Sequence, residues 1–401
     1  GAGGVERGGC SATIQRFALP MCRAAANKPD EPRVVTGVRV CFQLLSPLRR
    51  LATVVTASLM PLYAHAQVKS DEEVVFFPSA AHLSDDGAEW VVTIHGWVFE
   101  EETNSLLRRA ALYQFRKRLG LDAEDETTAM FEHRMRRFLV DNERGKRAKI
   151  ELAGRTYTMP ESGADGHFSM TLRIPVGDVR DEEAGGRLEF HAVLAEDDDR
   201  MIRGRIHLVS NEGVTVISDI DDTIKVSHVT DRHELVRSTF FKPFEAVEGM
   251  AELYAGWAEQ GAEFHFVSAS PWQLYEPLST FTQEAGFPDA AWSMKQIRLK
   301  DSTLLKLFDE PYAAKLAVIG DLVSASPRRR FVLVGDSGEK DPEVYGELAR
   351  RHPERILRVL IRNVTDETSD SERMREAFRD VGSETWQLFD GADEIETDLP
   401  D

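Results

Sequence analysis

The sequence predicts an α/β protein in which a parallel sheet covered by helices follows a smaller β-rich domain. Two buried-type apolar runs, 214–217 and 331–334, each lead into aspartates, as parallel strands do at their ligand-binding ends. Helical spacing of apolar residues surrounds Lys315, between these two runs. Further upstream, short strand patterns separated by turn-rich or acidic stretches indicate a sandwich-like domain with a helical insertion.

The first 66 residues differ in charge from the rest of the chain. They contain eight Lys and Arg against three acids, whereas the whole chain has a formal net charge of -19. Two arginines, the apolar stretch 51–63 and a small-x-small tripeptide ending at Ala66 follow one another, which is the layout of a secretory signal peptide. We expect cleavage after Ala66 and an exported, periplasmic protein; a membrane anchor and a cytoplasmic protein with an unstructured leader are the alternatives. All three cysteines precede this point, so the mature protein would have no disulfide.

Residues 67–211 form the predicted β-rich domain, in which the sequence shows no catalytic constellation. Two helical patterns, 105–119 and 127–140, interrupt the strands and carry basic residues on their polar sides. Such basic residues occur more often on a solvated face than in a binding surface. The expected strands are 73–77, 90–99, 149–159, 167–174, 187–195 and 203–209.

The strand 214–217 leads into the segment SDIDDT, residues 218–223. Because side chains alternate along a strand, we expect Asp219 and Asp221 on the same side, facing the crevice where ligands bind. The alternative is a purely structural role, in which these acids only end a strand and begin a turn. Three later segments supply the other parts of a phosphoryl-transfer site and favour the catalytic interpretation.

The first of these segments is the apolar run 264–267, which ends in the hydroxyl group of Ser268. Ser270 and Pro271 are then expected as the N-cap and first residue of a helix. A helix N-terminus beside a strand-end hydroxyl is suited to hold phosphate oxygens. The alternative is that Ser268 only ends the strand.

The second segment carries Lys315, beside the apolar face of a predicted helix. A cation there would neutralise a transferring phosphoryl group and the carboxylate that attacks it. An ordinary surface position is the alternative. Nearby competitors for the same role are Lys295, Lys300 and Lys306.

The third segment is the strand 331–334, which breaks at Gly335 and presents Asp336, with Asp341 five residues further on. Hard oxygen ligands at a strand end suit Mg²⁺, which takes one or two carboxylates together with water and substrate phosphate. Because Asp341 precedes Pro342, it is also a good N-cap for a helix.

Together the four segments resemble the motifs of the haloacid dehalogenase (HAD) superfamily of phosphotransferases, which occur in this order at the ends of neighbouring parallel strands. Residues 218–225 (SDIDDTIK), 267–275 (VSASPWQLY) and 331–345 (FVLVGDSGEKDPEVY) are similar to the phosphatidate phosphatase catalytic domain family named after the fungal actin-patch enzyme. The resemblance covers about residues 212–365, the predicted catalytic domain. Ala269 stands where that family has asparagine, and the histidine often found before the lysine is absent, which leaves the choice of Lys315 open.

The resemblance implies a Mg²⁺-dependent phosphatidate phosphatase with a HAD-like sheet and a minimal cap. It implies that Asp219 is the nucleophile that forms an aspartyl-phosphate. Asp221 would protonate the leaving alkoxide and then activate water. Ser268 and Lys315 would bind phosphoryl oxygens, and Thr223 would brace the nucleophile loop. The implied Mg²⁺ ligands are Asp219, the main-chain carbonyl of Asp221, Asp336 and, directly or through water, Asp341.

Motif spacing and one aromatic segment bear on the substrate. The first two motif residues are 49 positions apart (268 minus 219) and the next two are 47 apart (315 minus 268), so neither interval holds a large folded cap. An open site suits a bulky or membrane-embedded phosphoester. Phe240, Phe241 and Phe244 lie in the first interval, where they would contact a membrane surface or pack as a short flap on the core.

The net charge of -19 argues against binding to nucleic acid and against general adsorption to anionic membranes. An acidic C-terminal extension, 366–401, with a predicted helix at 371–379, contributes to this charge. A phospholipid partner would therefore have to bind locally or through a metal ion.

Two other functions remain open at this point. One is a HAD phosphatase that acts on a soluble phosphomonoester. The other is a non-catalytic lipid-binding module, against which the paired aspartates argue, because binding alone needs no general acid.

Overall fold

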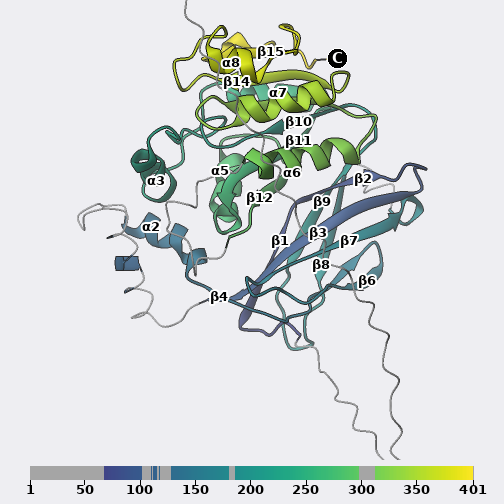
Figure 1. Cartoon of the computed structure of the whole chain (residues 1–401). Coiled ribbons are helices and arrows are strands. Elements are labelled where there is room, and N and C mark those ends of the chain that lie inside the picture. The colour runs from purple at the N-terminus through teal and green to yellow at the C-terminus, as the bar shows by residue number, and fades with distance from the viewer. Residues whose placement is uncertain are drawn as a thin grey trace, which may run out of the picture. The chain divides into compact units, whose positions relative to one another are not determined.

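The computed structural model describes residues 67–101, 110, 112–114, 117, 128–179, 186–297 and 312–400. These residues belong to the compact unit Tyr63–Asp401 and form two sheets with their connecting helices (Figure 1). The predicted signal peptide lies outside the described residues. None of the described helices is long and apolar enough to cross a bilayer.

The amino-terminal strands form one nine-stranded sheet in the order β1-β3-β2-β9-β8-β5-β6, with β4 and β7 also paired to β3. Every expected strand is present, although 149–159 is a hairpin that turns at Ala153 and Gly154, both with positive φ. Two short strands, β2 and β4, were not predicted. The strands are β1 (Glu72–Phe77), β2 (Ser79–Leu83), β3 (Glu89–Glu100), β4 (Asp141–Asn142), β5 (Lys149–Leu152), β6 (Arg155–Thr158), β7 (His167–Pro175), β8 (Arg187–Ala192) and β9 (Arg203–Val209).

The second sheet has six strands in the order β12-β11-β10-β13-β14-β15, and all neighbouring pairs run parallel. The apolar runs 214–217 and 331–334 lie in its central strands, which confirms the predicted α/β class. The strands are β10 (Val214–Ser218), β11 (Glu263–Pro271), β12 (Ala291–Lys295), β13 (Arg330–Asp336), β14 (Ile356–Arg362) and β15 (Trp386–Phe389). The helices are α3 (Arg232–Phe240), α4 (Met250–Glu259), α5 (Tyr275–Glu284), α6 (Tyr312–Ala325), α7 (Asp341–Arg351) and α8 (Glu372–Ala377).

Alternate residues of the two central strands face two separate cores. Val216 and Val332 belong to a core that includes Trp257 of α4, whereas Ile217 and Leu333 belong to one that includes α6 and α7. Both faces of the sheet are therefore covered, which explains why the strands are almost continuously apolar. The carboxyl ends of β10, β11 and β13 meet at one edge.

The C-terminal segment is part of the parallel sheet, whereas the sequence led us to expect only an acidic extension with one helix. That helix is present as α8, but β15 then pairs with β14 from Trp386 to Phe389. The Trp386 ring stacks on Phe378 with 4.2 Å between ring centroids. The sheet therefore continues beyond residue 365.

The helical insertion of the β-rich domain packs against α3, which belongs to the parallel-sheet domain. Its described part is α2 (Thr128–Met135) and a 3-10 turn, Arg136–Phe138; most of the other predicted helix, 105–119, lies outside the described residues. α2 lies beside α3 (Figure 1).

Of the two expected roles of the aromatic residues near α3, membrane contact and packing on the core, the structure shows packing for Phe240 and Phe241. Phe131 of α2 stacks on Phe241 with ring centroids 4.6 Å apart. Phe240 and Phe241 are only 1% and 2% exposed, and Phe244 is half-buried. The insertion covers the first two side chains, so they are not available to lipid in this conformation.

Buried histidines make the fold sensitive to acid. His95 Nε2 lies 3.0 Å from His167 Nδ1, where β3 and β7 pair. Burial, aided by His167, lowers the pKa of His95 from 6.5 to about 3, and burial lowers the pKa of His167 to about 4. Below pH 6.5 the unfolded chain therefore takes up protons that the folded chain does not bind until about pH 4 or lower. In that window the free energy of unfolding falls by roughly 1.4 kcal/mol per pH unit for each such histidine.

We expect the substitution His95→Gln to reduce this pH dependence, because it removes one group that binds a proton only in the unfolded chain. Urea unfolding at about pH 7.5 and about pH 5 gives the change in unfolding free energy for wild type and variant. His191→Gln is the matched control, because the His191 side chain is 51% exposed. Equal pH dependence in wild type and His95→Gln would contradict the prediction.

Candidate active site

The loop after β10 places Asp219 and Asp221 at the carboxyl edge of the parallel sheet, as predicted. The Asp219 N–H donates to Val334 O of β13 at 2.9 Å, and the Ile220 carbonyl accepts the Lys225 N–H at 3.0 Å. The chain thus folds back immediately after the strand. Both aspartates are buried, with 1% and 6% of their surfaces exposed.

Asp222 organises this loop, a role that the sequence analysis missed. Its φ is 53°, in the left-handed region. Its carboxylate accepts hydrogen bonds from the N–H groups of Ser227 (2.8 Å), His228 (3.0 Å) and Val229 (2.6 Å). The third aspartate of SDIDDT was the available signal, because Asp tolerates this conformation and binds nearby backbone N–H groups.

Lys315 of α6 joins Asp219 to Asp341. Its Nζ lies 2.9 Å from Asp219 Oδ1 and 2.5 Å from Asp341 Oδ1. Lys315 is 1% exposed, and a cation so deeply buried requires anionic partners. The structure thus brings this lysine to the expected nucleophile. Of its competitors, Lys295 ends β12, two strands from β10, and Lys300 and Lys306 lie outside the described residues.

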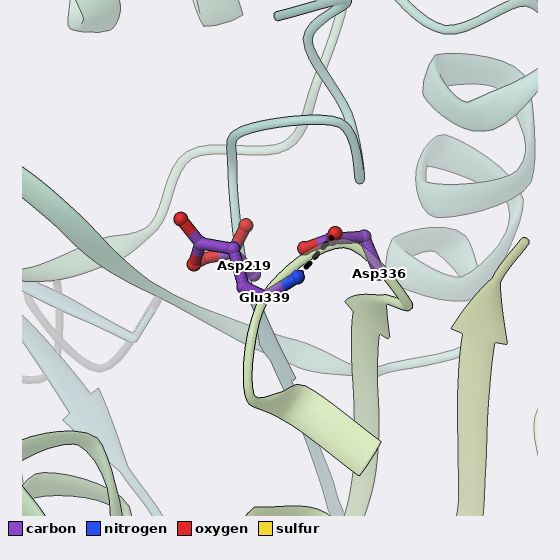
Figure 2. Close-up of side chains that lie close together, drawn as sticks. All are labelled: Asp219, Asp336 and Glu339. Atoms are coloured by element: carbon purple, nitrogen blue, oxygen red, sulfur yellow. Dashed lines mark hydrogen bonds between the residues drawn. The ribbon is translucent and has the colours of Figure 1, made fainter. Parts of the chain in front are cut away.

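Three carboxylates, from Asp219, Asp336 and Glu339, form what we call the carboxylate cluster (Figure 2). One oxygen atom of each lies within 4.8 Å of the other two. Asp336 Oδ1 accepts the N–H groups of Gly338 (2.6 Å) and Glu339 (3.1 Å), the second of which Figure 2 shows. Asp336 Oδ2 and Glu339 Oε2 are buried and accept no hydrogen bond from the described part of the chain, although Glu339 Oε2 lies 3.8 Å from Lys315 Nζ. Buried acceptor oxygens of this kind fit a bound cation.

The pKa values of the carboxylate cluster also favour a bound cation. Burial raises the pKa of Asp219, Asp336 and Glu339 well above the usual carboxyl range. Lys315 opposes the rise, whereas Asp341 adds to it. A divalent cation would stabilise the ionised forms, and all-oxygen ligands suit Mg²⁺. The residues present therefore fit the predicted metal.

The carboxylate cluster differs from the expected set of ligands. Glu339 was not predicted, although it stands three residues after Asp336 in a glycine-containing loop. Asp341 is not one of the three clustered carboxylates; its Oδ2 accepts the Asp336 N–H at 3.2 Å. The expected N-cap role of Asp341 was wrong, because α7 begins at that residue and the N-cap is Lys340. Gly335 permits this approach, since a Cβ atom there would lie 2.1 Å from Asp341 Oδ2.

We expect Glu339→Gln to weaken Mg²⁺ binding by at least roughly tenfold, because it removes one charge from the carboxylate cluster while keeping the side-chain shape. Titration calorimetry without substrate measures this affinity directly. Glu343→Gln is the matched control, because Glu343 pairs with Arg373 at 3.0 Å and with Lys340 at 3.0 Å instead. Equal Mg²⁺ affinities of the two variants would contradict the assignment of Glu339 as a metal ligand.

Asp221 has a separate set of partners. Its Oδ1 lies 2.8 Å from Lys225 Nζ and accepts the Ser227 hydroxyl at 2.7 Å, while its Oδ2 accepts the Ser270 hydroxyl at 3.1 Å. Burial alone would raise the pKa of Asp221, but the Lys225 charge and these hydrogen bonds lower it below the usual value. The environments of the two neighbouring aspartates therefore move their pKa values in opposite directions, that of Asp219 up and that of Asp221 down. A nucleophile and a general acid need the reverse order, which a divalent cation beside Asp219 and an anionic phosphate beside Asp221 would favour.

The two predicted hydroxyl groups also lie at this edge. Thr223 Oγ1 is 3.5 Å from Asp219 Oδ2, at the outer limit of a hydrogen bond. Ser268 is buried in β11, next to β10, and its Oγ accepts the Ser270 N–H at 3.0 Å. Because β11 runs on to Pro271, the expected helix start at Ser270 was wrong, and that serine supports Asp221 instead.

The residues that build this site come from one stretch of the chain that has known relatives. Residues 214–363 match the family described as the phosphatidate phosphatase APP1 catalytic domain. The APP1 match contains every predicted site residue as well as Glu339. The β-rich domain lies outside it.

Two curated relatives cover parts of the chain. An uncharacterized protein of Schizosaccharomyces pombe is 29% identical over 211 residues, which are 51% of this chain and 34% of that protein. Phosphatidate phosphatase APP1 of Saccharomyces cerevisiae is 32% identical over 166 residues, 40% of this chain and 28% of that protein. The chain thus spans about a third of the length of these relatives. Among solved structures, a 2,6-sialyltransferase of Photobacterium sp. JT-ISH-224 is 8% identical, covers 59% of this chain and 44% of its own, and has a TM-score of 0.22, too low for a shared fold.

Proposed function

We propose that this chain is a Mg²⁺-dependent phosphatidate phosphatase of the HAD type, which releases diacylglycerol and phosphate. The observation that carries the proposal is the contact of Lys315 with Asp219, a member of the carboxylate cluster. Both residues lie within the segment that matches a phosphatase domain. A carboxylate can approach an anionic phosphate only where positive charge offsets their repulsion. Lys315 supplies part of that charge; Asp219, Asp336 and Glu339 would hold a Mg²⁺ ion, which would supply the rest.

The first step transfers the phosphoryl group to Asp219. A carboxylate oxygen of Asp219 forms a bond to phosphorus while the bond from phosphorus to the ester oxygen breaks, which gives an aspartyl-phosphate. Lys315 and Ser268 bind the phosphoryl oxygens, and Thr223 holds the nucleophile. The leaving alkoxide takes a proton from Asp221 and departs as diacylglycerol.

The second step hydrolyses the aspartyl-phosphate. Asp221, now a carboxylate, takes a proton from water while the water oxygen bonds to phosphorus. The bond to Asp219 breaks, so that the carboxylate and inorganic phosphate are released. The contacts of Asp221 with Lys225 and two serines favour its ionised form, whereas a bound anionic phosphate favours the protonated form that the first step needs.

A soluble phosphomonoester is the second candidate substrate. The burial of Phe240 and Phe241 favours it, because two apolar side chains that were candidates for contact with lipid lie inside the protein. The chemistry at Asp219 and Asp221 would be unchanged. A third reading, a non-catalytic lipid-binding module, gives no reason for a buried aspartate to contact both a lysine and a metal-binding cluster.

Phosphate release distinguishes these functions. Phosphatidate in mixed micelles is compared with soluble phosphomonoesters, each with and without Mg²⁺, for wild type and Asp219→Asn. We expect Mg²⁺-dependent turnover of phosphatidate that Asp219→Asn lacks. Equal or faster turnover of soluble esters would overturn the lipid assignment, and activity in Asp219→Asn would overturn the mechanism.

We also propose that the protein is exported to the periplasm, because of the apolar stretch 51–63 and the small residues that precede Gln67. The mature amino terminus should be Gln67 in the periplasmic fraction, as determined by N-terminal sequencing. Recovery of the protein with residues 51–66 intact would contradict cleavage.

A further inference from the structure

We propose that Arg134, from the helical insertion of the β-rich domain, is a positioning residue for Asp221. The proposal rests on the proposed function, in which Asp221 transfers protons. Arg134 lies outside the 214–363 segment that matches the APP1 family. It acts through two routes, α3 and Phe244, which both lead to the loop that holds Asp221.

The first route begins at the carboxyl end of α3. Arg134 Nη1 donates to Thr239 O at 2.7 Å and to Ser238 O at 3.3 Å. The helix ends at Phe240, so these carbonyls are among the last four, which have no acceptor role inside the helix. A cation at this end also interacts favourably with the helix dipole. Arg134 is 6% exposed, and burial lowers its pKa to about 10, which leaves it charged at neutral pH.

From α3 the route continues through two buried serines. Ser238 Oγ lies 2.8 Å from the Ser227 carbonyl oxygen, and the Ser227 hydroxyl donates to Asp221 Oδ1 at 2.7 Å. Ser227 is fully buried, so it has little freedom to move independently of its neighbours. A shift of the α3 terminus would therefore displace a hydrogen-bond donor of Asp221.

The second route runs through the Phe244 ring. The guanidinium carbon of Arg134 lies 3.6 Å from the ring centroid, and Lys225 Nζ lies 5.1 Å from the same centroid. Both distances are in the range of cation–π attraction. Lys225 Nζ in turn lies 2.8 Å from Asp221 Oδ1, and its side chain is 1% exposed. Both routes thus end at the same carboxylate oxygen.

The β-rich domain thereby takes part in catalysis. Through Arg134 it supports the loop that orients the proton donor, although the proposed catalytic residues all belong to the parallel-sheet domain. The support matters most where the leaving group needs a proton. An alkoxide is a poor leaving group and needs protonation by Asp221, whereas an aryl oxide such as p-nitrophenolate departs with little help.

The test compares Arg134→Met with wild type on phosphatidate and on p-nitrophenyl phosphate. Methionine keeps an apolar stem beside Phe244 and removes the charge. We expect kcat on phosphatidate to fall about tenfold, with a clearly smaller loss on p-nitrophenyl phosphate and little change in KM. Arg136→Met is the matched control, because Arg136 is 40% exposed and pairs with Glu101; it should match wild type on both substrates.

Two further variants keep the test decisive if Arg134→Met does not fold. Arg134→Lys retains the charge and should lose less activity on phosphatidate than Arg134→Met. Phe244→Leu breaks the second route with an apolar side chain and should show the same preferential loss on phosphatidate.

The outcomes separate this inference from the proposed function. If Asp219→Asn is inactive but the Arg134 and Phe244 variants lose both activities equally, or neither, the inference is overturned and the proposed function stands. If Asp219→Asn retains activity, the proposed function falls, and the inference with it.

Discussion

Asp219→Asn should lower kcat by about 10⁴-fold or more, because an amide cannot form the aspartyl-phosphate. The fold should survive the change. Asparagine keeps the side-chain shape and can still accept a hydrogen bond from Lys315. Burial already raises the pKa of Asp219 well above the usual range, so an ionised carboxylate is costly there and a neutral amide is not. Thermal unfolding should therefore give a midpoint equal to or above that of wild type.

The phosphoenzyme itself offers a direct readout. Acid quenching during turnover of ³²P-labelled substrate should leave label on wild type and none on Asp219→Asn. Asp231→Asn is a suitable control, because Asp231 caps α3 through the N–H groups of His233 and Glu234, and asparagine caps equally well. Label on Asp219→Asn, or activity within tenfold of wild type, would rule out this nucleophile.

Lys315→Met should reduce both activity and stability. Loss of one positive group at the transferring phosphoryl typically lowers kcat by about 10² to 10³. Because the buried carboxyl groups of Asp219 and Asp341 would lose their cationic partner, we also expect the unfolding free energy to fall by about 3 kcal/mol. Added Mg²⁺ should recover part of that stability, since a bound cation offsets the same charges.

Kinetics and urea unfolding, each with and without Mg²⁺, measure the two effects of Lys315→Met. Lys340→Met is the matched control, because the Lys340 side chain is 58% exposed and pairs with Glu343. It should match wild type in both respects. A near-normal kcat for Lys315→Met would show that another lysine binds the transferring phosphoryl group.

Residues at strand ends were predictable from the sequence for a physical reason. A buried parallel strand is an apolar run, and the polar residue that ends it must lie at the carboxyl edge of the sheet. Asp219, Ser268 and Asp336 follow this rule, and the structure brings them to one edge of the same sheet. The position of Lys315 was harder to predict, because an apolar helix face does not indicate which neighbouring lysine points into the protein.

The remaining features depend on contacts between distant segments. Glu339 joins the carboxylate cluster because the loop turns back over Asp336, and a glutamate in a loop carries no pattern that reveals this. The sequence left membrane contact and packing on the core both open for Phe240 and Phe241, because nothing in their own segment shows that α2, about a hundred residues earlier, covers them. Arg134 was for the same reason indistinguishable from the other basic residues of its helix.

The pairing of β15 with β14 sets the boundary of the autonomous folding unit. A fragment that stops at residue 363 would retain every proposed catalytic group but lose α8 and β15. β14 would then be an edge strand with unpaired N–H and C=O groups, next to apolar surface that Met374 and Phe378 normally cover. Such a fragment should self-associate, and soluble recombinant protein should require the chain to continue at least through Phe389.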